Sequence, residues 1–271
     1  MHLWRKHATN DWLREHAEAL IARYGNAVAI VEQPGKRALV EVAIETQREA
    51  IHLQQEFAGR IEKLPADWLR RIAAQTPSKP LRIGSRLVVS HTKGPNTIVI
   101  PAEAAFGTGD HATTALCLRM LERLTRTCSP GWSMLDAGTG SGILAIAGSR
   151  FGAGRIIAVD NDPLACSTAK RNARVNETAN IEFRTGDVLK ARFRGQFDVI
   201  TANLFSELLI AALPNWMRHF AINGRLILSG VLRSQERSLM MALRQNGCAP
   251  AEIKRRGKWI AVLAARTRKR S

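Results

Sequence analysis

The stretch that decides the fold is residues 134–142, Met134-Leu135-Asp136-Ala137-Gly138-Thr139-Gly140-Ser141-Gly142. An apolar run leads into a turn with three glycines, and the run Ile143–Arg150 that follows has helical character. Glycine adopts backbone angles that other residues avoid, and it lets a ligand come close to the main chain. The first amides of the following helix lack intrahelical partners and can donate to that ligand. The stretch therefore predicts a strand, a ligand-binding turn and a helix.

From this turn outward, strand-like and helical segments alternate along the chain. The expected strands are 133–136, 155–160, 181–185, 197–203 and 225–230, each followed by a helical or turn segment. Such alternation predicts a parallel sheet with right-handed crossover connections. Two more strand-like runs, 249–255 and 258–265, meet at Gly257 and predict an antiparallel hairpin that finishes the sheet. The expected fold class is α/β, with a doubly wound, mostly parallel, Rossmann-like sheet of seven strands.

The glycine spacing does not by itself separate a dinucleotide such as NAD from another ligand that contains a ribose. It is G-x-G-x-G, and Ile143 stands where a dinucleotide-binding turn has its third glycine. Asp160 ends the second strand, 22 positions after Gly138. An acidic side chain at that point is placed to accept hydrogen bonds from both ribose hydroxyls, as it also does in NAD enzymes. The turn and Asp160 therefore predict a ligand that contains a ribose.

Polar side chains also end the next two strands. Asp187 follows the third strand, where it is placed to accept from an adenine amino group, and Asn203 ends the fourth strand. Three such side chains on successive strand ends predict one ligand crevice at the carboxyl edge of the sheet. In the competing interpretation, Asp160 and Asp187 only cap the helices that follow them.

A loop before the glycine turn, Ala105–Thr114, has a composition that a core does not explain. It holds two glycines, three threonines and one histidine, so we expect it to cover a ligand. Phe106 is expected over the ligand, and a threonine hydroxyl of the loop is expected at a ligand carboxylate. His111 has two interpretations of similar weight, a helix cap or a catalytic side chain.

Composition and charge point to the setting in which the protein works. The 40 Lys and Arg residues outnumber the 23 Asp and Glu residues, which leaves a net charge of +17. Such a surface favours contact with RNA or a ribonucleoprotein, although a generally basic proteome would produce the same excess.

The four cysteines are scattered, with no metal-ligand spacing, so we expect no metal site, no disulfide framework and a reducing cytoplasm. With no signal-peptide pattern at the N-terminus and no long apolar run, no membrane association is expected.

The pattern of the chain divides it into residues 1–64, a linker at 65–80 and a second domain at 81–271. The first domain reads as βαββαβ: strand His2–Ala8, a helix from Thr9 or Asn10 to Tyr24, strands Asn26–Val31 and Ala38–Ile44, a helix capped by Thr46 and strand Arg60–Leu64. This order predicts a small ferredoxin-like α+β domain. It carries no catalytic candidates, which favours a substrate-recognition role. Runs Arg82–Ser90 and Thr97–Ile100 are expected to form a hairpin at the start of the second domain.

Four segments together resemble one family. They are G-T-G-D-H-A-T-T at 107–114, D-A-G-T-G-S-G-I-L-A-I-A at 136–147, A-V-D-N-D-P at 158–163 and A-N-L-F at 202–205. With these motifs, residues 80–266 resemble the bacterial ribosomal protein L11 methyltransferase family, which belongs to the class I S-adenosylmethionine-dependent methyltransferases. The resemblance implies methyl transfer to amine nitrogen, on a lysine side chain or an N-terminal amine, of a ribosomal protein of the large subunit. It also implies that the small N-terminal domain recognises this substrate.

The resemblance implies S-adenosyl-L-methionine contacts at Thr114, Gly138, Asp160 and Asn203. The residues alone add three candidates to this donor site: Phe106 on the sulfonium side, Gly140 in the turn and Asp187 at the adenine. Asn203 is also the catalytic candidate, because its side chain could accept from the acceptor amine and aim the nitrogen lone pair at the methyl group.

The chain departs from the family pattern at several positions: Ile100-Pro101-Ala102, Ala112, Thr139 and Leu204-Phe205. Since the last of these follows Asn203 directly, the acceptor remains open. The alternatives are an RNA or small-molecule methyltransferase with the same donor site, and a dinucleotide-binding protein without catalytic activity. Ile143 and the terminal hairpin count against the last.

Overall fold

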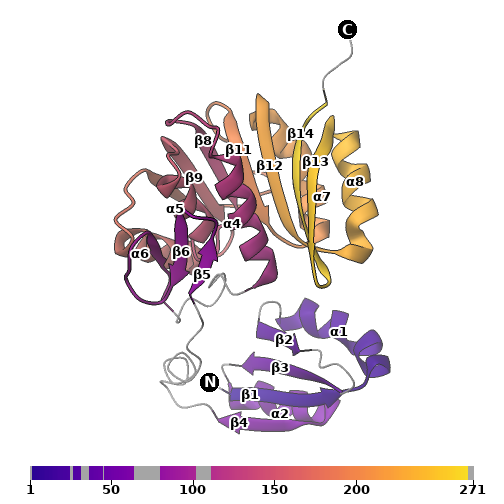
Figure 1. Ribbon diagram of the computed structural model, residues 1–271. Helices are drawn as coiled ribbons and strands as arrows, with labels where there is room; N and C mark the ends of the chain where they lie inside the picture. Colours follow the sequence, from indigo (N-terminus) through magenta and orange to yellow (C-terminus); the bar gives the residue numbers. More distant parts are fainter. Residues whose placement is uncertain are drawn as a thin grey trace. The chain divides into compact units, whose positions relative to one another are not determined.

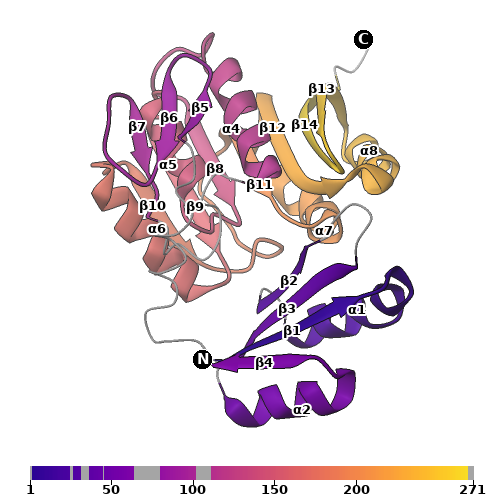
Figure 2. The same cartoon turned by 60° about the horizontal axis from the view of Figure 1, so that its bottom comes forward.

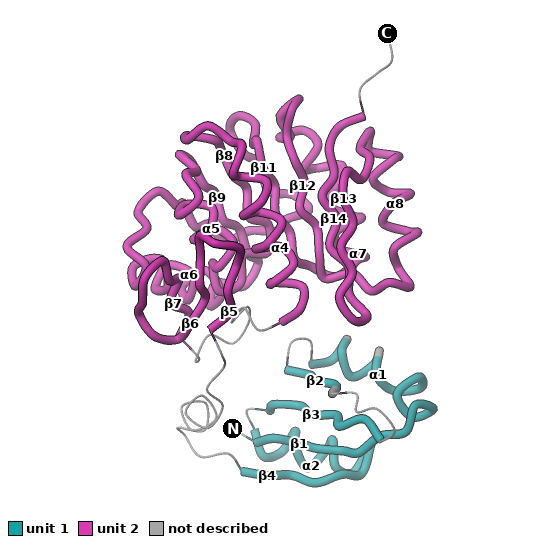
Figure 3. Tube along the Cα trace, in the orientation of Figure 1, with its two compact units in different colours: residues 1–75 teal, residues 76–271 magenta. Residues whose placement is uncertain are grey.

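The computed structural model describes residues 2–24, 27–31, 37–44, 46–63, 80–101 and 111–267 (Figure 1). The chain forms two compact units, residues 1–75 and 76–271 (Figure 3). No helix within the described ranges is long and apolar enough to cross a membrane. The same ranges contain no cluster of three or more His, Cys, Asp or Glu side chains suited to a metal ion.

The N-terminal unit is a ferredoxin-like α+β structure (Figure 2). Its elements are β1 (His2–Ala8), α1 (Asn10–Tyr24), β2 (Val28–Val31), β3 (Ala38–Ile44), α2 (Gln47–Phe57) and β4 (Arg60–Lys63). Its described strands form an antiparallel sheet in the order β2-β3-β1-β4. Strand β3 buries every second residue, and its buried face packs with Trp4, Leu20 of α1 and Leu53 of α2. Both helices therefore cover the same face of this sheet.

The second unit is built on a sheet whose described strands run in the order β10-β9-β8-β11-β12-β14-β13. They are β8 (Ser133–Ala137), β9 (Arg155–Asp160), β10 (Ile181–Thr185), β11 (Phe197–Asn203), β12 (Phe220–Leu232), β13 (Cys248–Arg256) and β14 (Trp259–Arg266). Strand β14 runs antiparallel to both of its neighbours, and the other pairings are parallel. The predicted seven-stranded sheet and its closing hairpin are thus confirmed. The fifth strand is longer than the run 225–230 expected for it.

Helices cover both faces of this sheet (Figures 1 and 2). The helices are α4 (Ala112–Leu124), α5 (Ile143–Arg150), α6 (Pro163–Val175), α7 (Ser206–Trp216) and α8 (Glu236–Gln245). Apolar residues of α4, α5 and α6 pack on one face, and those of α7 and α8 pack on the other. In β9, Ile156 and Ala158 face the first layer while Ile157 and Val159 face the second. Burial on both faces explains why the central strands read as continuous apolar runs.

The segment before α4 forms a three-stranded sheet, and one expectation for it is wrong. Strand β5 (Leu81–Ile83) pairs antiparallel with β6 (Leu87–Ser90), but β7 (Thr97–Val99) lies parallel to β6 instead of forming a hairpin with it. The buried Asn176 side chain, at the end of α6, accepts from Val99 N and donates to Val99 O, both at 2.8 Å. This amide occupies the hydrogen-bonding edge of β7 and holds the strand in place.

Candidate functional site

The glycine turn joins β8 to α5 at the carboxyl edge of the sheet (Figure 1). Gly138 and Gly140 have φ values of +73° and +53°, in the left-handed region that favours glycine. The Gly138 amide donates to Val159 O at 2.8 Å, and a Cβ atom on Gly138 would overlap with the Leu204 side chain. The turn is therefore held between the ends of β9 and β11, where only glycine fits.

Asp136 lies beneath this turn and is 1% exposed. Its carboxylate accepts from Thr139 Oγ1 at 2.7 Å and from Thr201 Oγ1 at 2.6 Å. Burial raises the pKa of Asp136 to about 6, against the opposing effect of these hydrogen bonds. Asp136 thus connects β8, the glycine turn and β11. Asp136 was not among the residues predicted for the site, although an acidic residue within an apolar strand is a signal that could have revealed it.

This buried carboxyl should make stability depend on pH, and Asp136→Asn is expected to remove the dependence. The folded protein binds the Asp136 proton more tightly than the unfolded chain, in which the pKa is near its ordinary value of 3.8. The associated stabilisation is complete below that value and is lost as pH rises through about 6. Between about pH 4.5 and 7 the wild type should lose about 2 kcal/mol relative to the variant. Urea unfolding of both proteins measures this, and parallel pH profiles would contradict it.

Asp160, at the end of β9, binds two nearby amides. Its Oδ2 accepts from Gly140 N at 2.9 Å and its Oδ1 accepts from Asp162 N at 3.1 Å. The residue that caps α6 is Asp162, which accepts from Leu164 N at 2.8 Å. Asp160 is therefore not the helix cap of the competing interpretation. Each of its oxygens can still accept a further hydrogen bond.

Asp187, after β10, has a local role. Its Oδ1 accepts from Leu189 N at 2.8 Å, and Lys190 Nζ lies 3.9 Å from its Oδ2. It thereby stabilises a turn. The competing interpretation expected it to cap a helix, but no helix begins there. The adenine contact at Asp187 stays a prediction.

Asn203, at the end of β11, meets Thr114 of α4. Its Nδ2 donates to Thr114 Oγ1 at 3.2 Å across 89 positions of sequence. Thr114 is 3% exposed. Within the part of the chain that the structure describes, no hydrogen bond to Asn203 Oδ1 is formed, so this oxygen is available to accept one. Two residues singled out in separate motifs thus lie side by side.

His111 is the N-cap of α4. Its Nδ1 accepts from Thr113 N at 3.4 Å and lies 2.6 Å from Thr113 Oγ1. The ring meets the edge of Trp259, with centroids 5.1 Å apart. Burial, followed by the charge of Lys258, lowers the pKa of His111 and favours the neutral ring. The capping interpretation describes this geometry. Phe106 and the rest of the loop from 102 to 110 lie outside the described residues.

Comparison with known proteins identifies the family of this chain. The model of a family described as ribosomal protein L11 methyltransferase (PrmA) matches residues 7–267. The chain belongs to the ribosomal protein L11 methyltransferase family. The match includes the glycine turn, Asp160, Asn203 and the antiparallel strand β14.

Curated relatives in the family match most of the chain. A ribosomal protein L11 methyltransferase from Pelotomaculum thermopropionicum is 40% identical over 194 residues, covering 69% of this chain and 62% of the relative. The one from Pelobacter propionicus is 38% identical over 200 residues, covering 69% of this chain and 63% of the relative. The matched part of the chain thus spans less than two thirds of these relatives' length.

Solved structures agree in fold. A ribosomal protein L11 methylase from Lactobacillus delbrueckii subsp. bulgaricus has 29% identity and a TM-score of 0.64, covering 70% of this chain and 99% of that one. An S-adenosylmethionine-dependent methyltransferase from Clostridium acetobutylicum has 12% identity and a TM-score of 0.50, covering 58% and 93%. The second likeness concerns the fold alone, and it is the class I methyltransferase fold.

Proposed function

We propose that this protein transfers methyl groups from S-adenosyl-L-methionine to an amine nitrogen of a ribosomal protein. The observation that carries the proposal is the Asn203–Thr114 pair beside the glycine turn, in a chain of this family. The acceptor would be a lysine side chain or the N-terminal amine of a large-subunit protein, and the enzyme would work in the cytoplasm.

The carboxyl edge of the sheet fits the donor. Gly138 lets the turn pack directly against Leu204, and Asp160 keeps acceptor capacity for two ribose hydroxyls. Gly140 lies in the same turn, Asp187 would accept from the adenine amino group, and Phe106 would cover the sulfonium. When bound, the donor supplies a methyl group already activated on a positively charged sulfur.

The chemistry left to the protein is to position the acceptor. Because the methyl group is activated, a neutral amine needs only to be held in line with the methyl group and the departing sulfur. Asn203 Oδ1 accepts an N–H of that amine, while Thr114 fixes the amide through Nδ2. An ammonium ion has no lone pair, so it first loses a proton to water.

The donor role of Asp160 gives a binding prediction. Asp160→Ala should weaken S-adenosylhomocysteine binding by roughly 1.5–3 kcal/mol, the usual loss for hydrogen bonds to a charged group. Titration calorimetry measures the affinity, with a thermal melt to show that the variant is folded. Asp160→Asn is the matched control, because it removes the charge but retains one oxygen for a neighbouring amide. Unchanged affinity in Asp160→Ala would exclude Asp160 from the donor site.

The second candidate is methylation of RNA, which the net charge of +17 favours. One experiment separates the two: the purified protein is incubated with donor labelled in the methyl group, separated ribosomal proteins and ribosomal RNA. Label in one ribosomal protein, at nitrogen, supports the proposal. Label in RNA alone would replace it with the second candidate.

We also propose that the N-terminal unit recognises the protein substrate. Its support is the separate core around Trp4, Leu20 and Leu53 together with the position of every donor candidate beyond residue 100. A compact unit with its own core and no donor candidate is suited to docking.

A further inference from the structure

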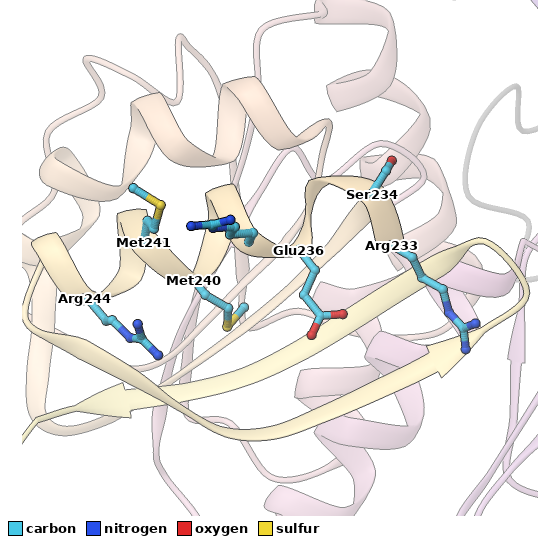
Figure 4. A pocket seen from close by; sticks show the side chains of 7 residues that line it. Arg233, Ser234, Glu236, Met240, Met241 and Arg244 are labelled. Atoms are coloured by element: carbon cyan, nitrogen blue, oxygen red, sulfur yellow. The ribbon is translucent and has the colours of Figure 1, made fainter.

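A groove runs along α8 and begins at the turn that follows the carboxyl end of β12, the strand beside β11. It is lined by α8 and by the short helical turn before it, Arg233–Gln235 (Figure 4). From Arg233 on, its side chains recur at positions 237, 240, 241 and 244, which is the spacing of one helix face. None of these residues takes part in the proposed methyl transfer.

The groove carries positive charge that its surroundings do not neutralise. Arg233, Arg237 and Arg244 are exposed, and none of them forms an ion pair or a side-chain hydrogen bond with the described part of the chain. The groove's one carboxylate, Glu236, is already engaged by Arg255 through hydrogen bonds of 2.5 and 3.0 Å. Three charges therefore remain available to a partner.

Two of these arginines lie where a helix does not favour them. Arg233 precedes α8 and Arg237 lies in its first turn. The N-terminal end of a helix carries partial positive charge, so cations there are unfavourable for the helix itself. Their position offers no benefit to the isolated fold, whereas it adds to the attraction of an anionic partner.

The groove also carries an apolar surface between its charges. Met241 is 50% exposed, and Met240 packs in part against the core beneath. Thioether side chains are flexible and adapt to varied apolar partners. No aromatic side chain lines the groove, so it lacks the stacking surfaces by which proteins hold single-stranded bases.

We propose that this groove docks an acidic amphipathic helix of a partner protein. Carboxylates at helical spacing pair with Arg233, Arg237 and Arg244, and an apolar side chain packs on Met241. This mode resembles a helix laid in a groove, with charge complementarity that sets its register. The proposal goes beyond the methyl-transfer function and does not depend on it.

The test uses the full chain and a fluorescent 18-residue helical peptide with Glu and Leu on one face. Fluorescence anisotropy should show at least tenfold tighter binding than for a scrambled peptide of the same composition. Arg237→Gln/Arg244→Gln should weaken binding at least tenfold, and Met241→Ser several-fold. Arg171→Gln, which removes one exposed arginine of α6, is the matched control and should change affinity less than twofold.

Three outcomes would overturn the proposal. They are equal affinity for the two peptides, equal losses in the groove and control variants, and a single-stranded RNA of 12 nucleotides that binds this groove more tightly than the peptide does. Thermal melts and S-adenosylhomocysteine affinity of each variant confirm that the fold is retained.

Discussion

A chain that begins at Thr76 is expected to bind S-adenosylhomocysteine as well as the full chain and to methylate a folded protein acceptor about 10²–10⁴-fold less efficiently. The donor candidates belong to the second unit, residues 76–271, which has its own core on both faces of its sheet. If the first unit docks the acceptor, it converts encounter of the amine with Asn203 into an event within one complex. Removing the unit loses this effective concentration but no donor contact.

The measurement compares donor affinity by calorimetry and kcat/KM on the folded acceptor for both chains. Residues 1–75 added as a separate chain should restore little activity at micromolar concentration, because the covalent connection is what raises the local concentration. A short peptide acceptor should show a smaller difference than the folded protein. Full activity of the shortened chain on the folded acceptor would show that the N-terminal unit does not recognise substrate.

Asn203→Ala is expected to lower kcat by about 10²-fold, the usual consequence of misplacing a reacting group by about 1 Å. S-adenosylhomocysteine affinity should fall by much less than kcat does, because Asn203 Oδ1 is proposed to bind the acceptor amine. Single-turnover rates and donor calorimetry on the same preparation separate these two quantities.

Thr114 supplies the matched control for this prediction. Thr114→Val removes the hydroxyl that accepts from Asn203 Nδ2 while keeping the volume of the side chain. It should reduce kcat less than Asn203→Ala does, and Thr114→Ser should restore most of the rate. Equal losses of turnover and of donor affinity in Asn203→Ala would make Asn203 a donor ligand only.

Much of the fold could be predicted because its signals are local. The runs at 155–160 and 181–185 became strands with the expected bounds, and the run expected at 133–136 became β8, which ends one residue later at Ala137. The β-rich run Ala38–Ile44 became strand β3 with the expected bounds, and Thr46 caps α2 as expected by accepting from Glu49 N at 3.3 Å. These features depend on residues within a few positions of one another.

The candidate site could be predicted only in part. Sequence motifs named Gly138, Asp160 and Asn203 separately, since each stands at the end of a strand. They did not show which local bonds each side chain makes. The carboxylate of Asp187 holds a turn, and His111 caps α4 against Trp259, which follows it by 148 positions.

The sequence by itself determined the strands, the glycine turn and the family, because hydrophobic periodicity and glycine conformation act over short stretches of chain. Only the tertiary structure decided that Thr114 meets Asn203, that Asp136 is buried between Thr139 and Thr201, and that β7 lies parallel to β6 beside Asn176. Each of these contacts forms only once the sheet and its helices have packed together. A buried polar group takes whichever partner that packing brings within hydrogen-bonding distance, and the spacing of residues along the chain does not specify that partner.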